Sequence, residues 1–373
     1  MEFSIDRGDL VEAVAQAARA LPSRTPVPVL GGLLLDAADG RLSVSGYDFE
    51  TAARIETDAE VGRGGRVLVL GRRLLDICKV LPDGQVSCSL EGTRFTVEAG
   101  GTGFGLSTLP QEEYPAPPAP PKAYGTVDAA AFATAVAQVA VAAGRDETLP
   151  VLTGVQLRLE GEEMTLAASD RYRYAVRRLA WSPQPGADAA GVVETLAPAR
   201  RLLDVARSLA RCSLVRIGLD GSSGRGPIGF EGGRTRTVVR PLEGRLPSYG
   251  KLFDMADAAV AEVGCGPLTE AVRRVAVVAD ADSPVRLDFS ADSVLVRAGH
   301  GDDVAAQRVP AALTGAREIT VAFSPAYLLD ALASFETPAL RVALLGAGQR
   351  ALLSAADGPQ IHRHLLMSVR QLV

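Results

Sequence analysis

The sequence feature that most constrains the fold is a tripeptide, Leu-Leu-Asp, that recurs three times at nearly equal spacing. It stands at residues 74–76, 202–204 and 328–330, so that neighbouring copies are about 125 residues apart. Solenoids and propellers repeat every ~20–50 residues, whereas ~125 residues is the size of a small domain. The spacing therefore predicts three copies of a whole domain.

The agreement between the three thirds extends beyond the tripeptide and keeps one order. Each third opens with an amphipathic helical stretch, continues with strand-like alternation, reaches the Leu-Leu-Asp helix and returns to strand-like sequence. Residues 28–48 and 150–170 align without a gap, and the more divergent third copy keeps a period-two alternation over 285–296. Helices and strands in this order predict an α+β domain.

Two joins between the repeats are visible in the composition. Residues 115–121 are dominated by proline, which is typical of a stiff, extended linker. We place the second join at 254–261, after a Pro-Ser-Tyr turn and before the third helical stretch. We therefore expect domains over residues 1–122, 123–254 and 255–373.

Composition narrows the class of protein. A chain of 373 residues with 47% hydrophobic content can bury two or three cores, and no apolar run reaches the roughly eighteen residues of a membrane span. The first residues lack a basic and apolar leader. The cysteines, Cys78, Cys88, Cys212 and Cys265, lack the paired spacing of disulfides or a zinc site. We expect a cytoplasmic protein with reduced thiols and no membrane partner.

Basic residues gather around the repeated helices although the chain has a net charge of −5. Charged residues on an amphipathic helix are ordinarily solvated and need no ligand. A basic surface on an otherwise acidic molecule also suits a polyanion, because the acidic remainder limits nonspecific adhesion. Charge alone leaves both interpretations open.

The sequence gives little support to an enzyme. The only histidines are His300, His362 and His364, and the last two would share one face of a strand without a third ligand at typical metal-site spacing. The glycine-rich stretches match neither a P-loop nor a dinucleotide-binding pattern. The repeated aspartates arise from duplication rather than as a catalytic pair. We predict no catalytic site, no metal and no cofactor.

Six motifs in a fixed order carry a resemblance to one family. They are Arg-Thr-Pro-Val-Pro-Val-Leu at 24–30, Leu-Leu-Asp-Ile-Cys at 74–78, Leu-Ser-Thr-Leu-Pro at 106–110, Ser-Asp-Arg-Tyr-Arg at 169–173, Glu-Gly-Arg-Leu-Pro-Ser-Tyr at 243–249 and Leu-Leu-Met-Ser-Val-Arg at 365–370. The chain resembles the bacterial DNA polymerase sliding clamps, the β subunits of the replicative polymerase, over essentially its whole length. The resemblance implies three similar α+β domains of the DNA clamp fold. It also implies a head-to-tail dimer forming a pseudo-sixfold ring, with helices lining the central hole and sheets outside.

The same resemblance implies a processivity factor that encircles double-stranded DNA and has no catalytic site of its own. Helices that carry Arg and Lys attract phosphates without reading bases, which sliding requires. By resemblance, the residues expected to face DNA are Arg24, Arg72, Arg73, Lys79, Arg200, Arg201 and Arg207.

A homodimer seam is implied between the first repeat of one chain and the third repeat of the other. A head-to-tail seam closes into a ring when its rotation matches the symmetry. Apolar residues on the last strand of the first repeat would meet the end of the third repeat's opening helix, with opposite charges beside them. The residues expected there are Arg94, Phe104, Leu106, Val277, Val278, Asp302 and Asp303. The apolar ones could equally be ordinary core.

The resemblance further implies a groove between the second and third domains, where partners dock a short linear peptide. The partners would be the DNA polymerase III alpha subunit, the clamp loader and other proteins with a clamp-binding motif. Apolar side chains would receive peptide anchors, with basic residues at the rim. The residues expected in this groove are Leu152, Ser169, Arg171, Tyr172, Arg173, Tyr174, Pro247, Lys251, Leu252, Tyr327, Leu365, Leu366, Met367, Ser368, Val369 and Arg370. Leu365 to Val369 could also form a terminal core strand, and both roles are compatible.

Three departures from the family pattern fall at this groove. Tyr174 stands where an aliphatic residue is usual, Ser368 replaces a usual proline, and residues 371–373 alter and extend the ending. Lineage drift accounts for these changes, and so does a specialised second clamp copy whose groove rejects a groove-directed inhibitor, which would give antibiotic resistance. Another alternative is a peptide-binding scaffold without DNA, because basic residues are sparser on the third repeat.

Overall fold

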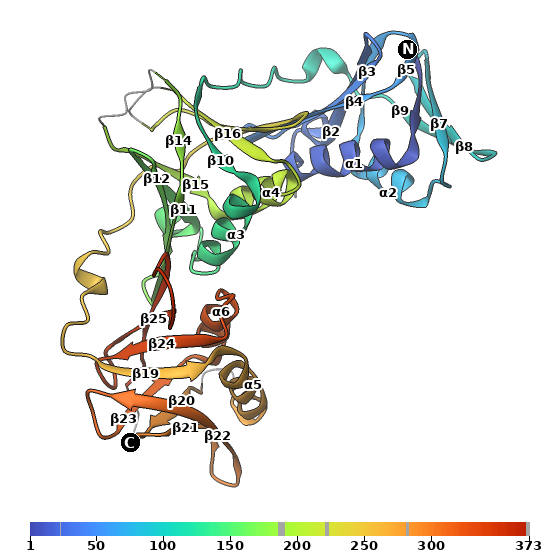
Figure 1. The fold of residues 1–373 in the computed structure, drawn as a ribbon. Helices are drawn as coiled ribbons and strands as arrows, with labels where there is room; N and C mark the ends of the chain where they lie inside the picture. The colour runs from blue at the N-terminus through green and yellow to red at the C-terminus, as the bar shows by residue number, and fades with distance from the viewer. Residues whose placement is uncertain (23, 186–190, 221–223, 281–282, 371–373) are drawn as a thin grey trace. The chain divides into compact units, whose positions relative to one another are not determined.

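The computed structural model describes the whole chain except residues 23, 186–190, 221–223, 281–282 and 371–373. The altered ending at 371–373 therefore lies outside the described residues. Figure 1 shows helices and strands in the order that the sequence predicts for each third.

The first repeat contains two α-helices, and each begins directly after a strand. They are α1 (Arg7–Ala17) and α2 (Gly71–Val80). Asp6 caps α1, because its Oδ1 accepts a hydrogen bond from the N–H of Gly8 at 2.7 Å. The strands are β1 (Glu2–Asp6), β2 (Gly32–Ala38), β3 (Arg41–Tyr47), β4 (Thr51–Asp58), β5 (Glu60–Arg63), β6 (Gly65–Leu70), β7 (Gln85–Glu91), β8 (Arg94–Ala99) and β9 (Thr102–Ser107).

The second repeat reproduces the first, element by element. Its helices are α3 (Ala129–Ala140) and α4 (Ala199–Leu209). Its strands are β10 (Ala123–Asp128), β11 (Gly154–Glu160), β12 (Glu163–Ser169), β13 (Arg173–Ala180), β14 (Ser182–Pro183), β15 (Val193–Pro198), β16 (Leu214–Leu219), β17 (Ile228–Gly232) and β18 (Thr235–Val239). The strands β2, β3 and β4 have the same lengths as β11, β12 and β13 and stand at a constant offset from them. The alignment without a gap is therefore confirmed.

The third repeat keeps the order, with a shorter β20 and longer β21 and β22. Its helices are α5 (Cys265–Val275) and α6 (Pro325–Ala333). The proline at the start of α6 costs no hydrogen bond, because N–H groups in the first turn of a helix have no carbonyl partner within it. Its strands are β19 (Ala259–Gly264), β20 (Val285–Phe289), β21 (Ser293–His300), β22 (Asp303–Thr314), β23 (Ile319–Phe323), β24 (Ala339–Leu344), β25 (Arg350–Ala355) and β26 (His362–Met367). The predicted alternation over 285–296 belongs to β20 and β21.

The chain divides into two compact units, and each sheet lies within one of them. The N-terminal unit comprises 1–133, 181–191 and 204–241, and the C-terminal unit comprises 134–180, 192–203 and 242–373. The N-terminal unit holds the sheets β5-β1-β7-β8-β9 and β14-β10-β16-β17-β18-β4-β3-β2-β6. The C-terminal unit holds β15-β11-β12-β13-β26-β25-β24-β19-β22-β21-β20-β23. The second repeat contributes to both units, so the boundaries at 122 and 254 stay predictions.

Strand pairing joins successive repeats in the same way twice. In the N-terminal unit β4 pairs antiparallel with β18, with Thr51 opposite Val239. In the C-terminal unit the equivalent strand β13 pairs with β26, with Arg173 opposite Leu366. In both cases the fourth strand of one repeat pairs with the last strand of the next repeat. This recurring junction positions the candidate site.

The repeated leucines contribute unequally to the cores. Leu74, Leu202 and Leu328 are fully or almost fully buried, whereas the leucine that follows each of them is only partly buried. On a helix, adjacent positions point about 100° apart, so one leucine of each pair faces the core squarely. The first leucine of each pair therefore belongs to a core, and the second is covered only in part.

Two expectations from composition can be compared with the described residues. Cys78, Cys88 and Cys265 are buried thiols, and Cys212 is half-buried. No helix within the described part of the chain is both long enough and apolar enough to span a membrane.

Candidate functional site

The residues predicted to line the peptide groove all belong to the C-terminal unit. They come from the 3₁₀ helix η4 (Pro150–Thr153), the turn between β12 and β13, the segment around the 3₁₀ helix η5 (Lys251–Phe253), helix α6 and the end of β26. We call this set of residues the groove surface. Its most exposed apolar side chains are Tyr172, at 60%, and Met367 and Val369, at 36% and 38%.

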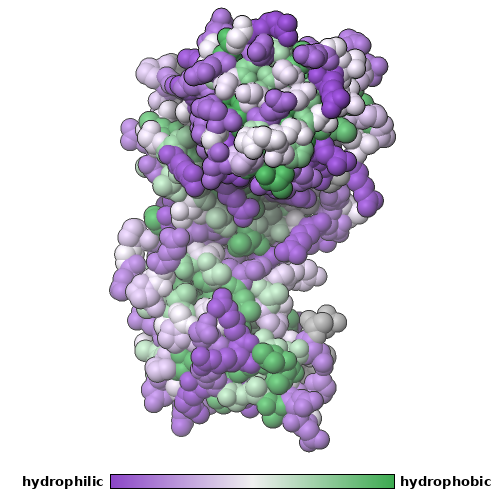
Figure 2. Space-filling model, turned by 90° about the vertical axis from the view of Figure 1, so that its right-hand side faces the viewer, coloured by the Kyte–Doolittle hydropathy of each residue, from purple (hydrophilic) through white to green (hydrophobic). Residues whose placement is uncertain are grey.

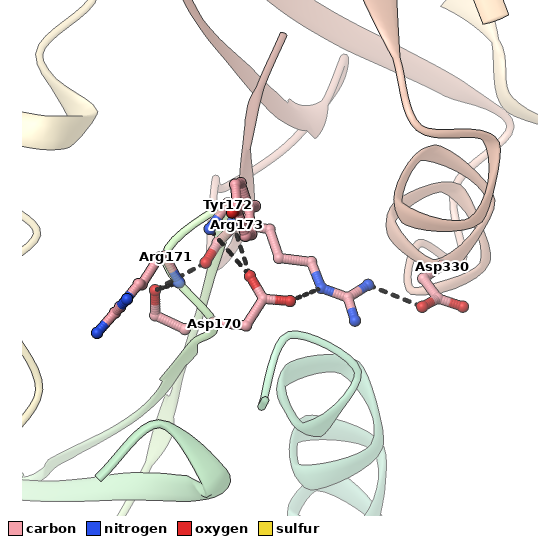
Figure 3. Close-up of polar contacts among 6 residues, drawn as sticks. Asp170, Arg171, Tyr172, Arg173 and Asp330 are labelled. Atoms are coloured by element: carbon pink, nitrogen blue, oxygen red, sulfur yellow. Dashed lines mark hydrogen bonds and ion pairs between the residues drawn. The ribbon is translucent and has the colours of Figure 1, made fainter. Parts of the chain in front are cut away.

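The turn between β12 and β13 is held by side-chain caps on its own backbone. One carboxylate oxygen of Asp170 accepts hydrogen bonds from the N–H groups of Tyr172 and Arg173, at 3.0 and 3.1 Å. The hydroxyl of Ser169 donates to the carbonyl of Arg173 at 2.8 Å. Arg171 adopts a left-handed conformation with φ 82°, which an aspartate-capped turn can hold despite its cost. Figure 3 shows the consequence, because Arg171 and Arg173 extend in opposite directions from the turn.

Arg173 links this turn to helix α6. Its Nε donates to Asp170 at 2.8 Å and its Nη1 donates to Asp330 at 2.7 Å (Figure 3). The guanidinium carbon lies 4.4 Å from the centre of the Tyr327 ring, a cation–π geometry. The Arg173 side chain is only 6% exposed. Two carboxylates therefore neutralise a charge that is almost wholly removed from water.

Tyr174 points into an aromatic cluster beside the turn. Its ring centre lies 5.7 Å from that of Tyr249 and 5.8 Å from that of Phe253, and its hydroxyl donates to the carbonyl of Pro247 at 3.0 Å. Only 4% of Tyr174 is exposed. Burial, reinforced by Tyr249 and then Glu194, raises the pKa of the Tyr174 phenol above its ordinary value. The ring thus fills the space between β13 and the 247–253 segment and fixes that segment.

Ser368 uses both its hydroxyl and its backbone. The Oγ lies within hydrogen-bond distance of the carbonyls of Gly346 and Gln349, at 3.1 and 2.9 Å, and accepts from the N–H of Gln349 at 3.0 Å. Its own N–H donates to the Gln349 carbonyl at 2.9 Å. A proline could supply neither the hydroxyl nor the N–H. The substitution therefore ties the end of β26 to the loop before β25.

Several basic side chains belong to the groove surface or contact it, and their place at a groove rim stays a prediction. Arg171, Lys251 and Arg370 are exposed. Arg350 donates to the carbonyls of Lys251 and Leu252 at 3.0 and 3.2 Å, and Arg363 lies over the Phe253 ring at 4.9 Å. The last two residues support the 247–253 segment rather than offering free charge to a ligand.

The histidines of β26 lie on one face of that strand, as their spacing predicts. The ring centres of His362 and His364 are 6.3 Å apart, and both rings are buried. His362 Nδ1 lies 3.2 Å from the carbonyl of Val176, which can only accept, so Nδ1 carries the proton. His362 Nε2 lies 2.9 Å from Ser334 Oγ, which also lies 2.7 Å from the carbonyl of Ala331. Burial lowers the pKa of His362 to about 4 and holds that of His364 well below its ordinary value.

The residues predicted to face DNA lie on or near the Leu-Leu-Asp helices. On α2, Arg72, Arg73 and Lys79 are exposed, and Lys79 forms an ion pair with Asp76 at 3.0 Å. Arg200 and Arg207 are exposed on α4, where Arg201 is half-buried, and Arg24 is exposed in a loop of the first repeat.

The residues predicted at the seam lie on the edge strand β9 and its neighbour β8, in the 3₁₀ helix η6 (Ala276–Val278) and around the start of β22. Phe104 and Leu106 lie on β9, the edge strand of its sheet; Leu106 belongs to the core and Phe104 packs against it. Arg94 is exposed on the neighbouring strand β8. Val277 is 82% exposed, next to the partly buried Val278, while Asp302 and Asp303 are exposed at the start of β22. Figure 2 shows one face of the molecule, on which green hydrophobic patches lie among purple hydrophilic residues.

Sequence reasoning missed some residues of the groove surface. Asp330, Tyr249, Phe253 and Arg350 contact predicted residues but were not among them, and Arg363 in turn contacts Phe253. Asp330 had a signal, since it belongs to the third Leu-Leu-Asp copy. The others had none, because their contacts join segments that are distant in the sequence.

A chain of three α+β repeats, whose second and third copies are joined by strand pairing, has the architecture of a processivity clamp. Models of the DNA polymerase III beta subunit match along the chain: its N-terminal domain at residues 1–118, its central domain at 126–248 and its C-terminal domain at 251–370. The chain belongs to the DNA polymerase III beta subunit family.

Individual relatives agree with this assignment. The chain is 46% identical to the beta sliding clamp of Streptomyces coelicolor and 39% identical to the beta sliding clamp homolog GriR of Streptomyces muensis, with 99% of each chain covered in both comparisons. Among solved structures, a sliding clamp of Pseudomonas aeruginosa bound to griselimycin superposes with a TM-score of 0.89 at 24% identity, covering 100% of both chains. The Bacillus subtilis clamp gives the same TM-score and identity, covering 100% of this chain and 99% of its own. These structures show that the fold is shared.

Proposed function

We propose that this protein is a DNA sliding clamp that closes around duplex DNA as a head-to-tail dimer and tethers polymerase and other partners through the groove surface. The observation that carries the proposal is the recurring junction between repeats. It occurs at β4 with β18 and at β13 with β26. The third repeat has the equivalent strand, β22, and the first repeat has the equivalent last strand, β9.

Both of these strands have an unused edge in the part of the chain that the structure describes. Over 303–310, β22 pairs with β21 alone, and β9 pairs with β8 at the edge of its sheet. A third junction of the same kind would join β22 of one chain to β9 of another. Two such junctions close a ring of six repeats. The exposed Val277 and Val304 beside β22 would then be covered by the partner.

The DNA-facing role rests on the exposed cations of α2 and α4. Exposed Arg and Lys side chains neutralise phosphates individually and weakly, so binding depends on salt and not on base sequence. Topological closure would supply the retention. The protein would therefore act as a processivity factor rather than as an enzyme, and its cytoplasmic location stays a prediction.

Loading on circular DNA tests the clamp function. The protein should be retained on a nicked circular plasmid in the presence of a clamp loader and should be released when the plasmid is linearised. Reversing charge in the variant Arg72→Glu, Arg73→Glu, Arg207→Glu should lower the loaded fraction and reduce its salt dependence. A peptide-binding scaffold without DNA would never associate with the plasmid, and a chain that stays monomeric by solution mass would contradict the ring.

The specialised-copy interpretation is the second candidate, and the contacts of Tyr174 and Ser368 favour it. The Tyr174 ring fills space within the groove surface, and the Ser368 hydroxyl binds the end of β26 to the loop before β25. A ligand that needs this space must displace a ring packed against two other aromatic rings. Griselimycin is the probe, because a related clamp binds it. The double variant Tyr174→Leu, Ser368→Pro should bind griselimycin more tightly than the unaltered protein, with little change for a peptide of the polymerase III alpha subunit. Equal griselimycin affinity would eliminate this candidate.

A further inference from the structure

The three repeated aspartates have different environments in the fold. Asp76 is exposed on α2 and pairs with Lys79 on the same helix, at 3.0 Å. The backbone carbonyl of Asp204 accepts a hydrogen bond from Arg19 at 2.9 Å. Asp330 alone of the three makes a side-chain ion pair with a residue of the groove surface, Arg173. One ancestral position has therefore acquired a distinct role in the third repeat.

The ion pair between Arg173 and Asp330 contributes more to the orientation of the Arg173 side chain than to stability. Asp170 already neutralises Arg173, and its side chain is nearly as buried as that of the arginine. Asp330 is 44% exposed, so its ionic contribution is screened by water. Asp330 instead restricts the orientation of the guanidinium, because it binds Nη1 while Asp170 binds Nε.

The orientation of Arg173 in turn determines how two tyrosines lie. The guanidinium lies over the Tyr327 ring, 4.4 Å from its centre, and the Tyr327 ring centre lies 6.1 Å from that of Tyr172. Tyr172 is the most exposed aromatic residue of the groove surface. Asp330 and Tyr327 both belong to α6, whereas Asp170, Tyr172 and Arg173 belong to the second repeat.

We propose that Asp330 is a positioning residue of the peptide groove: it holds Arg173 against Tyr327, and so fixes Tyr327 and Tyr172 as the aromatic wall that receives an apolar peptide anchor. This inference rests on the proposed function of the groove surface. Asp330 does not touch the ligand. Its effect passes through Arg173, whose Nε and Nη1 donate to carboxylates.

Binding measurements on full-length dimers test the inference. The probes are griselimycin and a fluorescein-labelled clamp-binding peptide of the polymerase III alpha subunit. The variant Asp330→Asn should bind both probes about 5- to 30-fold more weakly, the range expected when one fixed contact of a small interface is lost. Asp330→Glu should recover part of the affinity, because it restores the charge with a longer reach. The matched control Asp76→Asn, at the same position of the first repeat, should bind as the unaltered protein does.

Two further readouts separate positioning from general destabilisation. In a double-mutant cycle, Arg173→Gln with Asp330→Asn should bind no more weakly than Arg173→Gln alone, since both changes remove the same contact. In fluorotyrosine NMR, the Tyr327 signal, assigned with Tyr327→Phe, should shift in Asp330→Asn and stay in place in Asp76→Asn.

The outcomes distinguish this inference from the proposed function. If the unaltered protein binds neither probe, the groove function itself is wrong. If the unaltered protein binds and Asp330→Asn binds equally well with an unmoved Tyr327 signal, the positioning role is wrong while the groove stands. Retention of Asp330→Asn on circular plasmid should match that of the unaltered protein, because the ring does not depend on this pair.

Discussion

In the turn after β3, a carboxylate oxygen of Asp48 accepts hydrogen bonds from the N–H groups of Glu50 and Thr51, at 3.1 and 2.7 Å. In the turn after β12, Asp170 does the same for Tyr172 and Arg173. The residue after each aspartate is left-handed, Phe49 with φ 69° and Arg171 with φ 82°. The two turns share one backbone and carry different side chains.

The difference lies in four aligned positions. The first repeat has Phe49, Glu50, Thr51 and Ala52 where the second has Arg171, Tyr172, Arg173 and Tyr174. Both repeats pass from the turn into a strand that pairs with the next repeat. Strand pairing alone therefore makes a junction, and the arginine and two tyrosines of the second repeat give its junction the chemistry of a binding surface.

The largest expected effect comes from removing the charge that distinguishes the second turn. Arg173→Ala leaves Asp170 buried without its cation and should lower the free energy of unfolding by about 3 kcal/mol, as for other broken buried pairs. The measurement is urea unfolding monitored on the C-terminal unit. The matched change Thr51→Val should not lower the free energy of unfolding, because among the described residues the buried Thr51 hydroxyl has no hydrogen-bond partner to lose. Equal effects at the two positions would contradict the comparison.

The second-largest effect concerns pH, because the last strands of the two junctions, β26 and β18, carry different side chains. His362 and His364 occupy β26 positions where β18 has Thr235 and Thr237. The pKa of His362 is lowered to about 4 by burial, so the unfolded chain binds a proton more readily. Above pH 6.5 His362 is neutral in both the folded and the unfolded chain, so the free energy of unfolding is not reduced. As the pH falls from 6.5 toward 4, only the unfolded chain binds the proton, and the free energy of unfolding decreases by up to about 3 kcal/mol.

Hydrogen exchange at pH 7.5 and pH 5.0 measures this difference directly. Amides of β26 should lose protection at the lower pH relative to those of β18. The variant His362→Gln should reduce the pH dependence of β26 exchange. Equal loss of protection in both strands would show that the histidines are not its cause.

A smaller effect is expected from the hydroxyl of Tyr174, for which the first repeat has only Ala52. Tyr174→Phe keeps the ring and removes the hydrogen bond to the Pro247 carbonyl, so stability should fall by about 1 kcal/mol. Exchange of amides in residues 247–253 should accelerate. Tyr249→Phe retains the same ring cluster and serves as the control; a similar acceleration there would argue against the Pro247 contact.

The smallest effect is expected at the left-handed residues, where the two turns agree. Asparagine tolerates this conformation better than most residues, so Phe49→Asn and Arg171→Asn should each raise stability by about 0.5 kcal/mol. Both should shift the urea midpoint upward by similar amounts. A gain at one position only would mean that the two backbones are not under the same strain.

Local pattern was enough to predict the elements of the first two repeats. The alignment over 28–48 and 150–170 depends on turn residues and strand alternation that each copy carries itself, and the strands begin and end accordingly. The groove residues were predicted from the family resemblance, and their role stays a prediction; the structure places them all in one unit.

The supporting residues could not be predicted in this way. Asp330 and Arg173 are separated by 157 positions, and nothing local to either indicates the other. The cluster of Tyr174, Tyr249 and Phe253 likewise depends on how the 247–253 segment folds back. The second leucine of each repeated pair shows the same limit, because helical periodicity does not reveal how fully a position is covered.

The junctions between repeats have a consequence for how such a protein can change over generations. The N–H of Arg240 donates to the carbonyl of Glu50, and the N–H of Met367 donates to the carbonyl of Tyr172, both at 2.8 Å. These bonds use main-chain atoms, so they survive almost any substitution at the four residues. Mutations at a junction can therefore change its side chains while the main-chain hydrogen bonds between the repeats are kept. A duplicated copy in the same genome can diverge in what it recognises while its repeats stay joined as before.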